Sequence, residues 1–195
     1  MKNSIPGMGD ALLVVDVQND FLPGGSLAVP HGDEVVAPLN RCLALFAGLQ
    51  LPVYASRDWH PADHCSFRAQ GGPWPPHCIA GTPGADFAAA LQLPATACIV
   101  SKADSPGKDA YSAFDGTDLQ RRLQTDGVRR LYVGGLATDY CVLSTVKDAL
   151  QLGYRVVLLG DAIRAVEVVP GDGERAVAEM RGLGAQPALA AELAP

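Results

Sequence analysis

Four side chains with reactive groups stand at or just after the ends of four short apolar runs: Asp16, Asp58, Lys102 and Cys141. If those runs are parallel strands, their carboxyl ends share one edge of a sheet, where open α/β sheets bind ligands. At such an edge a carboxylate can take a thiol proton and an ammonium can favour the thiolate, which is the chemistry of a cysteine nucleophile. We therefore expect a catalytic site assembled from separate segments.

Cys141 follows a run of small residues in the stretch GGLATDYCV, residues 134–142. Taken alone it is better explained as a core residue, because free cysteines are among the most buried residues. Asp16 and Lys102, taken singly, are likewise typical of solvated strand ends. Together the three groups favour a nucleophile. If Thr138 caps a helix, Cys141 lies in its first turn, where backbone N–H groups and the helix dipole favour an anion.

A second set of polar residues lies in the stretches RDWHPADH and WPPHC. Residues two apart in an extended segment face the same way, so Asp58 and His60 can present an oxygen and a nitrogen to one point. His77 could add a third ligand, which leaves coordination positions open for water or substrate. The pattern is short and loop histidines are common, so the residues alone leave both a metal site and plain loop histidines open.

The elements that must position these groups alternate between strands and helices. Short valine-rich runs, typical of strands buried on both faces, occupy residues 11–17, 51–57, 97–102, 130–135 and 154–161. Helical patterns occupy residues 33–50, 117–127, 138–153 and 173–184. This alternation predicts a three-layer α/β fold, with a mostly parallel central sheet and helices on both faces. Residues 19–32 and 58–87 show neither pattern, and we expect functional loops there.

Length and composition indicate one domain over residues 1–195, of which 48% are hydrophobic. The net charge of −6 and the scattered basic residues argue against a nucleic-acid partner. The first apolar run is too short for a signal peptide or a membrane span, so we expect a cytoplasmic protein with no membrane partner. The five cysteines include no C-x-x-C pair, which favours reduced thiols.

Several stretches of the chain resemble the nicotinamidase/pyrazinamidase branch of the isochorismatase-like cysteine hydrolases. They stand in the family's order along nearly the whole length: VVDVQNDFLPGGSLAV, RDWHPADHCSF, WPPHC, GTPGADF, DAYSAF and GGLATDYCVLSTVKDALQLGY. The resemblance implies the isochorismatase-like hydrolase fold. It also implies hydrolysis of nicotinamide, and of pyrazinamide, to the acid and ammonia through a thioester on Cys141.

The resemblance further implies roles for individual residues. Asp16, Lys102 and Cys141 would form a catalytic triad. The backbone N–H groups of Ala137 and Cys141 would bind the oxyanion, next to a cis peptide bond between Leu136 and Ala137. The substrate would lie among the side chains of Phe21, Trp74 and Tyr111.

One divalent metal ion is also implied by the resemblance, with Asp58, His60 and His77 as ligands. His64, four residues after His60, would be either a fourth ligand or a residue behind the ligands. Zinc, iron and manganese all accept such ligands, so the sequence does not name the metal.

Two other functions stay open at this point. A related hydrolase could act on another small amide or on an ether, and a non-catalytic module could use the same fold to bind a metal or ligand. The sequence allows a homo-oligomer without indicating one.

Overall fold

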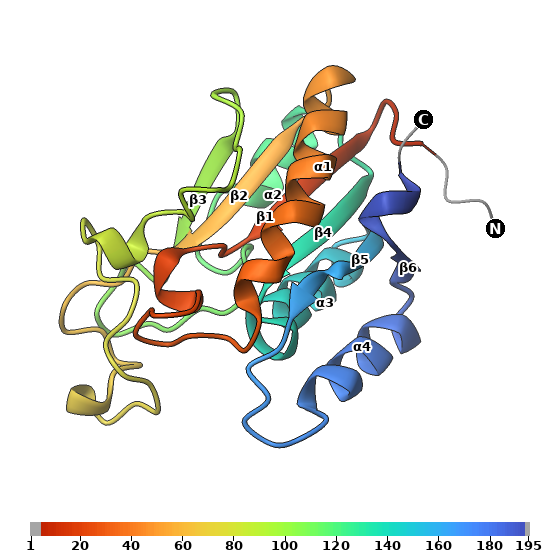
Figure 1. Cartoon of the computed structure of the whole chain (residues 1–195). Helices are drawn as coiled ribbons and strands as arrows, with labels where there is room; N and C mark the ends of the chain where they lie inside the picture. Colours follow the sequence, from red (N-terminus) through yellow and green to blue (C-terminus); the bar gives the residue numbers. More distant parts are fainter. Residues whose placement is uncertain (1–4, 194–195) are drawn as a thin grey trace.

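The computed structural model describes residues 5–193, which form a six-stranded sheet with helices on both faces (Figure 1). The strand order is β3-β2-β1-β4-β5-β6, and every neighbouring pair is parallel. The strands are β1 (Asp10–Val15), β2 (Val53–Asp58), β3 (Cys98–Lys102), β4 (Arg130–Leu136), β5 (Arg155–Arg164) and β6 (Gln186–Ala188). The predicted α/β fold with a parallel central sheet is therefore confirmed.

Two apolar cores, one on each face of the sheet, hold the helices in place. The helices are α1 (Val36–Gly48), α2 (Leu119–Thr125), α3 (Leu143–Gln151) and α4 (Asp172–Gly182). Side chains alternate between the faces along a strand. In β1, Leu12 and Val14 belong to the core beneath α1, whereas Leu13 and Val15 belong to the core beneath α2, α3 and α4. All four of these side chains are fully buried, as the continuous apolar run predicts.

The observed elements depart from the predicted ones at three places. The predicted helix 138–153 begins with a π-helical turn, Thr138–Val142, before α3. The N-cap is Ala137, which makes no side-chain capping bond, so the expected cap at Thr138 was wrong. Strand β5 runs on to Arg164, past a register shift opposite β4. Strand β6 was not predicted, because three residues that include a proline carry no periodic signal.

The strand order reverses between β1 and β4: the chain goes from β1 to β2 and β3 on one side, and then to β4, β5 and β6 on the other. In open α/β sheets such a switch point is where ligands bind. The register sets the side chains there: Asp58 pairs directly with Lys102, and Val15 pairs with Ser56. Residues 58–87, expected as a loop, contain two short 3₁₀ turns and lie over this edge (Figure 1).

Two further properties of the described chain bear on the predictions. Within residues 5–193, no helix has both the length and the apolar character needed to cross a bilayer. All five cysteines are free thiols.

Gly135 in β4 allows the close approach of two strands beneath the site. Its φ is 129°, and a Cβ there would lie 2.0 Å from the Val15 carbonyl oxygen. We expect Gly135→Ala to lower the free energy of unfolding by more than about 3 kcal/mol, because the backbone of β1 would have to shift. Gly153→Ala is the matched control: φ is 88° but nothing lies within 4 Å, so about 1 kcal/mol is expected. Equal losses in urea denaturation would contradict this account.

Candidate active site

The four residues predicted at the sheet edge do meet there. Asp58 and Lys102 end β2 and β3, Asp16 directly follows β1, and Cys141 lies in the π-helical turn after β4. Reactive atoms of Asp16, Asp58 and Cys141 all lie within 4.8 Å of one another. Each of the four residues is at most 6% exposed, so their charges interact with little screening by solvent.

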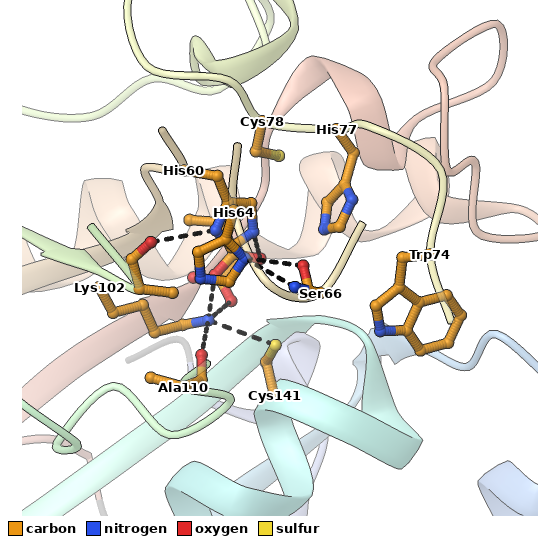
Figure 2. Close-up of polar contacts among 12 residues, drawn as sticks. His60, His64, Ser66, Trp74, His77, Cys78, Lys102, Ala110 and Cys141 are labelled. Carbon is orange, nitrogen blue, oxygen red and sulfur yellow. Dashed lines mark hydrogen bonds and ion pairs between the residues drawn. The ribbon is translucent and has the colours of Figure 1, made fainter. Parts of the chain in front are cut away.

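Lys102 stands at the centre of the cluster, as Figure 2 shows. Its Nζ contacts Asp58 Oδ1 and donates hydrogen bonds to the Ala110 carbonyl at 3.1 Å and to Cys141 Sγ at 3.4 Å. Asp16 Oδ2 lies 3.0 Å from the same nitrogen. Burial opposes the charge, but Asp16 and Asp58 outweigh it and hold the pKa of Lys102 well above its usual range. Lys102 is therefore a fixed cation at neutral pH.

Asp16 keeps one carboxylate oxygen free of hydrogen bonds. Its Oδ1 accepts a hydrogen bond from Ser56 Oγ at 2.7 Å, whereas Oδ2 accepts none from the described residues. Lys102 donates to Asp58, Ala110 and Cys141, and Asp16 Oδ2 forms an ion pair with the same ammonium. Burial raises the pKa of Asp16, against the opposing effect of Lys102. Such an oxygen can accept a proton from the neighbouring thiol.

Cys141 rests as a neutral thiol. Burial raises the pKa of its thiol well above the usual value, Lys102 opposes this, and Asp16 adds to it. The Cys141 side chain lies at the start of the helical segment that continues into α3, as predicted from the sequence. The peptide bond between Leu136 and Ala137, just before this segment, is cis.

Asp58, His60 and His77 form a second cluster, with one ligand atom from each residue within 4.8 Å of the others. His60 Nδ1 lies 3.1 Å from the Ala103 carbonyl and His77 Nδ1 lies 2.8 Å from the Pro75 carbonyl. A carbonyl oxygen only accepts, so each Nδ1 carries the hydrogen and each Nε2 keeps its lone pair.

This pattern fits a divalent metal ion. His60 Nε2 and Asp58 Oδ2 lie 3.6 Å apart, so two acceptors face each other, and a cation between them would satisfy both. Burial lowers the pKa of His77, against the hydrogen bond to Pro75, which keeps its ring neutral and able to ligate. The donor set of two imidazole nitrogens and one carboxylate suits zinc, iron or manganese.

The structure does not bring His64 into the cluster of possible ligands. Its Nε2 lies 3.1 Å from the Lys108 carbonyl, which fixes the hydrogen on Nε2. Its Nδ1 then accepts from the Ser66 hydroxyl at 2.8 Å and from the Ser66 backbone N–H at 3.3 Å. Both nitrogens are therefore used, and the ring stacks on His60 with 4.2 Å between centroids (Figure 2).

A small pocket opens onto Cys141 and Asp58. Phe21, Trp74 and Tyr111, the three residues predicted around a substrate, all line it. Its other lining residues are Leu27, His77, Ala137, Tyr140 and Val166. Trp74 donates its indole N–H to the Tyr111 hydroxyl at 3.0 Å, which fixes two walls against each other. The lining is mainly apolar and aromatic, so the pocket suits a small flat ring.

Some contributors to the site were missed from the sequence. Tyr140 packs edge-on against Trp74 with 5.1 Å between centroids, and its place next to Cys141 was an available signal. Gln18 was a weaker signal, two residues after Asp16 in an extended segment. Its buried side chain accepts from the Asp58 N–H and donates to the Asp58 carbonyl, each at 2.8 Å, and so fixes the backbone of Asp58. Val166 comes from a loop whose sequence carried no signal.

Comparisons with known proteins agree with this geometry. A family profile described as the isochorismatase domain matches residues 10–192. The chain is similar to a nicotinamidase from Escherichia coli (strain K12), with 42% identity over 90% of this chain and 92% of the relative.

Two solved structures are also similar to the chain. One is the pyrazinamidase of Pyrococcus horikoshii in complex with zinc, with 48% identity, a TM-score of 0.89, and coverage of 93% of this chain and 99% of that one. The other is PnC1 from L. infantum in complex with nicotinate, with 36% identity, a TM-score of 0.89, and coverage of 100% and 99%.

The hydrogen bonds of the histidines predict different metal contents in two variants. His77→Ala removes a free lone pair and should lower the metal bound per chain by more than about tenfold. His64→Asn should keep the metal, because Asn retains an acceptor for Ser66 and no ligand is lost. Elemental analysis after gel filtration measures both, with circular dichroism as the check on folding. Loss of metal from folded His64→Asn to the level of His77→Ala would make His64 a ligand.

Proposed function

Because the chain belongs to the isochorismatase family, we propose that it is a cysteine amidohydrolase that converts nicotinamide to nicotinate and ammonia. The observation that carries the proposal is the meeting of Lys102 and Asp16 with Cys141, which lines an aromatic pocket. The names of the similar proteins, a nicotinamidase and a pyrazinamidase, and the nicotinate bound in a third, support a pyridine-type carboxamide as substrate.

The first half of the reaction forms a thioester on Cys141. The thiol proton passes to Asp16 Oδ2 while sulfur attacks the carboxamide carbon, and Lys102 stabilises the charge that develops on sulfur. Because burial keeps the resting thiol neutral, proton transfer accompanies the attack. The backbone N–H groups of Ala137 and Cys141 donate to the oxygen of the tetrahedral intermediate. The C–N bond then breaks, Asp16 gives its proton to the leaving nitrogen, and ammonia departs.

The second half returns the enzyme to its starting state. A water molecule gives a proton to Asp16 and attacks the thioester carbon. The C–S bond breaks, the acid leaves, and sulfur takes the proton back from Asp16. Asp16 thus accepts and returns one proton in each half, which suits a carboxyl group whose pKa burial raises while Lys102 opposes the rise.

Asp58, His60 and His77 would hold one divalent cation, which when bound orients the ring nitrogen of the substrate or a water next to it. The zinc in the similar pyrazinamidase favours zinc over iron or manganese. Phe21 and Trp74 would flank the ring, with Tyr111 beside Trp74. A cytoplasmic location and a homo-oligomeric state stay predictions from the sequence.

Ammonia release tests the proposal directly. The purified protein should release ammonia from nicotinamide and pyrazinamide, with benzamide lower by at least about tenfold in kcat/KM because its ring lacks the nitrogen. Cys141→Ala should abolish turnover while Cys98→Ala, a cysteine at the opposite end of β3 from Lys102, keeps it.

Three results would count against the proposal. If the activity of Cys141→Ala stayed within about tenfold of wild type, Cys141 could not be the nucleophile. Equal kcat/KM values for the three amides would show that the site does not recognise the ring nitrogen. Absence of ammonia from all of them would leave a hydrolase of another substrate or a non-catalytic binding module.

A further inference from the structure

The segment between β5 and α4, residues 165–171, forms a loop at the carboxyl end of β5 (Figure 1). It contributes Val166 to the pocket wall, while Val168 and Val169 at its tip are 60% and 56% exposed. A wall that belongs to a surface loop needs a specific anchor, because few buried apolar contacts hold such a segment in place.

Asp139 supplies that anchor from the turn that carries Cys141. Its Oδ1 accepts a hydrogen bond from the Val166 N–H at 2.9 Å, and its Oδ2 accepts one from the Glu167 N–H at 3.0 Å. Hydrogen bonds from amides to an ionised carboxylate are stronger than those between neutral groups. These two hydrogen bonds tie the loop to the turn that carries Cys141.

Other carboxylates shape the loop without attaching it to the site. Glu167, with a left-handed φ of 58°, accepts from the N–H groups of Gly171 and Gly173 at 2.6 and 2.9 Å. Asp172 accepts from the Val169 N–H at 2.8 Å. These hydrogen bonds fix the conformation of the loop, whereas Asp139 fixes the position of the loop relative to Cys141.

We propose that Asp139 is a positioning residue for substrate selection, which holds Val166 against the ring of the bound amide. The inference rests on the proposed amidohydrolase function and adds a residue to it. Asp139 touches neither the reacting atoms nor the cluster of Lys102, so its carboxylate acts on binding of the ring and not on the chemical steps. Because Asp139 lies two residues before Cys141, one short turn carries both the nucleophile and the residue that holds Val166.

Steady-state kinetics with nicotinamide test the proposal through a double-mutant cycle. Asp139→Asn keeps the size of the side chain but replaces one acceptor by a donor, so KM should rise by about fivefold or more while kcat stays within about twofold. Val166→Ala should raise KM in the same way. In the double variant the rise should equal the larger single effect, because both substitutions remove one interaction.

Asp172→Asn is the matched control, since Asp172, the first residue of α4, binds the Val169 N–H of the same loop but not Val166, and its KM should equal that of wild type. A wild-type KM in Asp139→Asn or Val166→Ala, or additive effects in the double variant, would overturn the proposal. A fall in kcat at unchanged KM would do the same. A wild-type protein that releases no ammonia from nicotinamide would contradict the proposed function instead, which separates the two failures.

Discussion

The structure depends on one buried positive charge. An ammonium taken out of water is strongly destabilising unless it is paired and its protons find acceptors. Lys102 meets this condition because parallel pairing of β2 and β3 sets Asp58 directly opposite it, and because the chain after β1 turns Asp16 toward the same nitrogen. The Ala110 carbonyl and the sulfur of Cys141 accept further hydrogen bonds from the ammonium. The same contacts that make the charge tolerable thus place a base and a cation beside a nucleophile.

Asp58 links this cluster to the histidines. One of its oxygens contacts Lys102 and the other faces His60 Nε2 at 3.6 Å, so a single carboxylate serves two positively charged partners when a metal is bound. Its backbone is held in turn by the buried side chain of Gln18. Burial raises the pKa of Asp58, but the neighbouring Lys102 ammonium opposes burial and the pKa is lowered, so this carboxylate stays ionised. Asp16, which lacks a histidine partner, is left as the group that can exchange a proton.

The sequence predicted the parts of the molecule that follow from periodicity and from strand ends. Valine-rich runs gave the five longer strands, and the ends of four of them located Asp16, Asp58, Lys102 and Cys141. It could not predict contributions that depend on side-chain hydrogen bonds or on irregular backbone. The hydrogen bond of His64 Nε2 is made to the carbonyl of Lys108, which is 44 residues away. Val166 reaches the pocket only because Asp139 binds two amides of its loop. The π-helical turn Thr138–Val142 is likewise too short, at five residues, to show a hydrophobic periodicity of its own.

The central claim, that the Lys102 ammonium holds the pKa of the buried Cys141 thiol below what burial alone would give, is tested by the pH dependence of Cys141 alkylation. An ammonium near sulfur favours the thiolate, so Lys102→Met should raise the pKa of the thiol and slow labelling by iodoacetamide about tenfold for each unit of the shift. Lys147→Met removes an exposed ammonium on α3 that pairs with Glu179, and should leave the profile unchanged. Peptide mass spectrometry resolves Cys141 from the other thiols. A profile displaced to higher pH in Lys102→Met alone is the predicted result, and coincident profiles for wild type and Lys102→Met would contradict it.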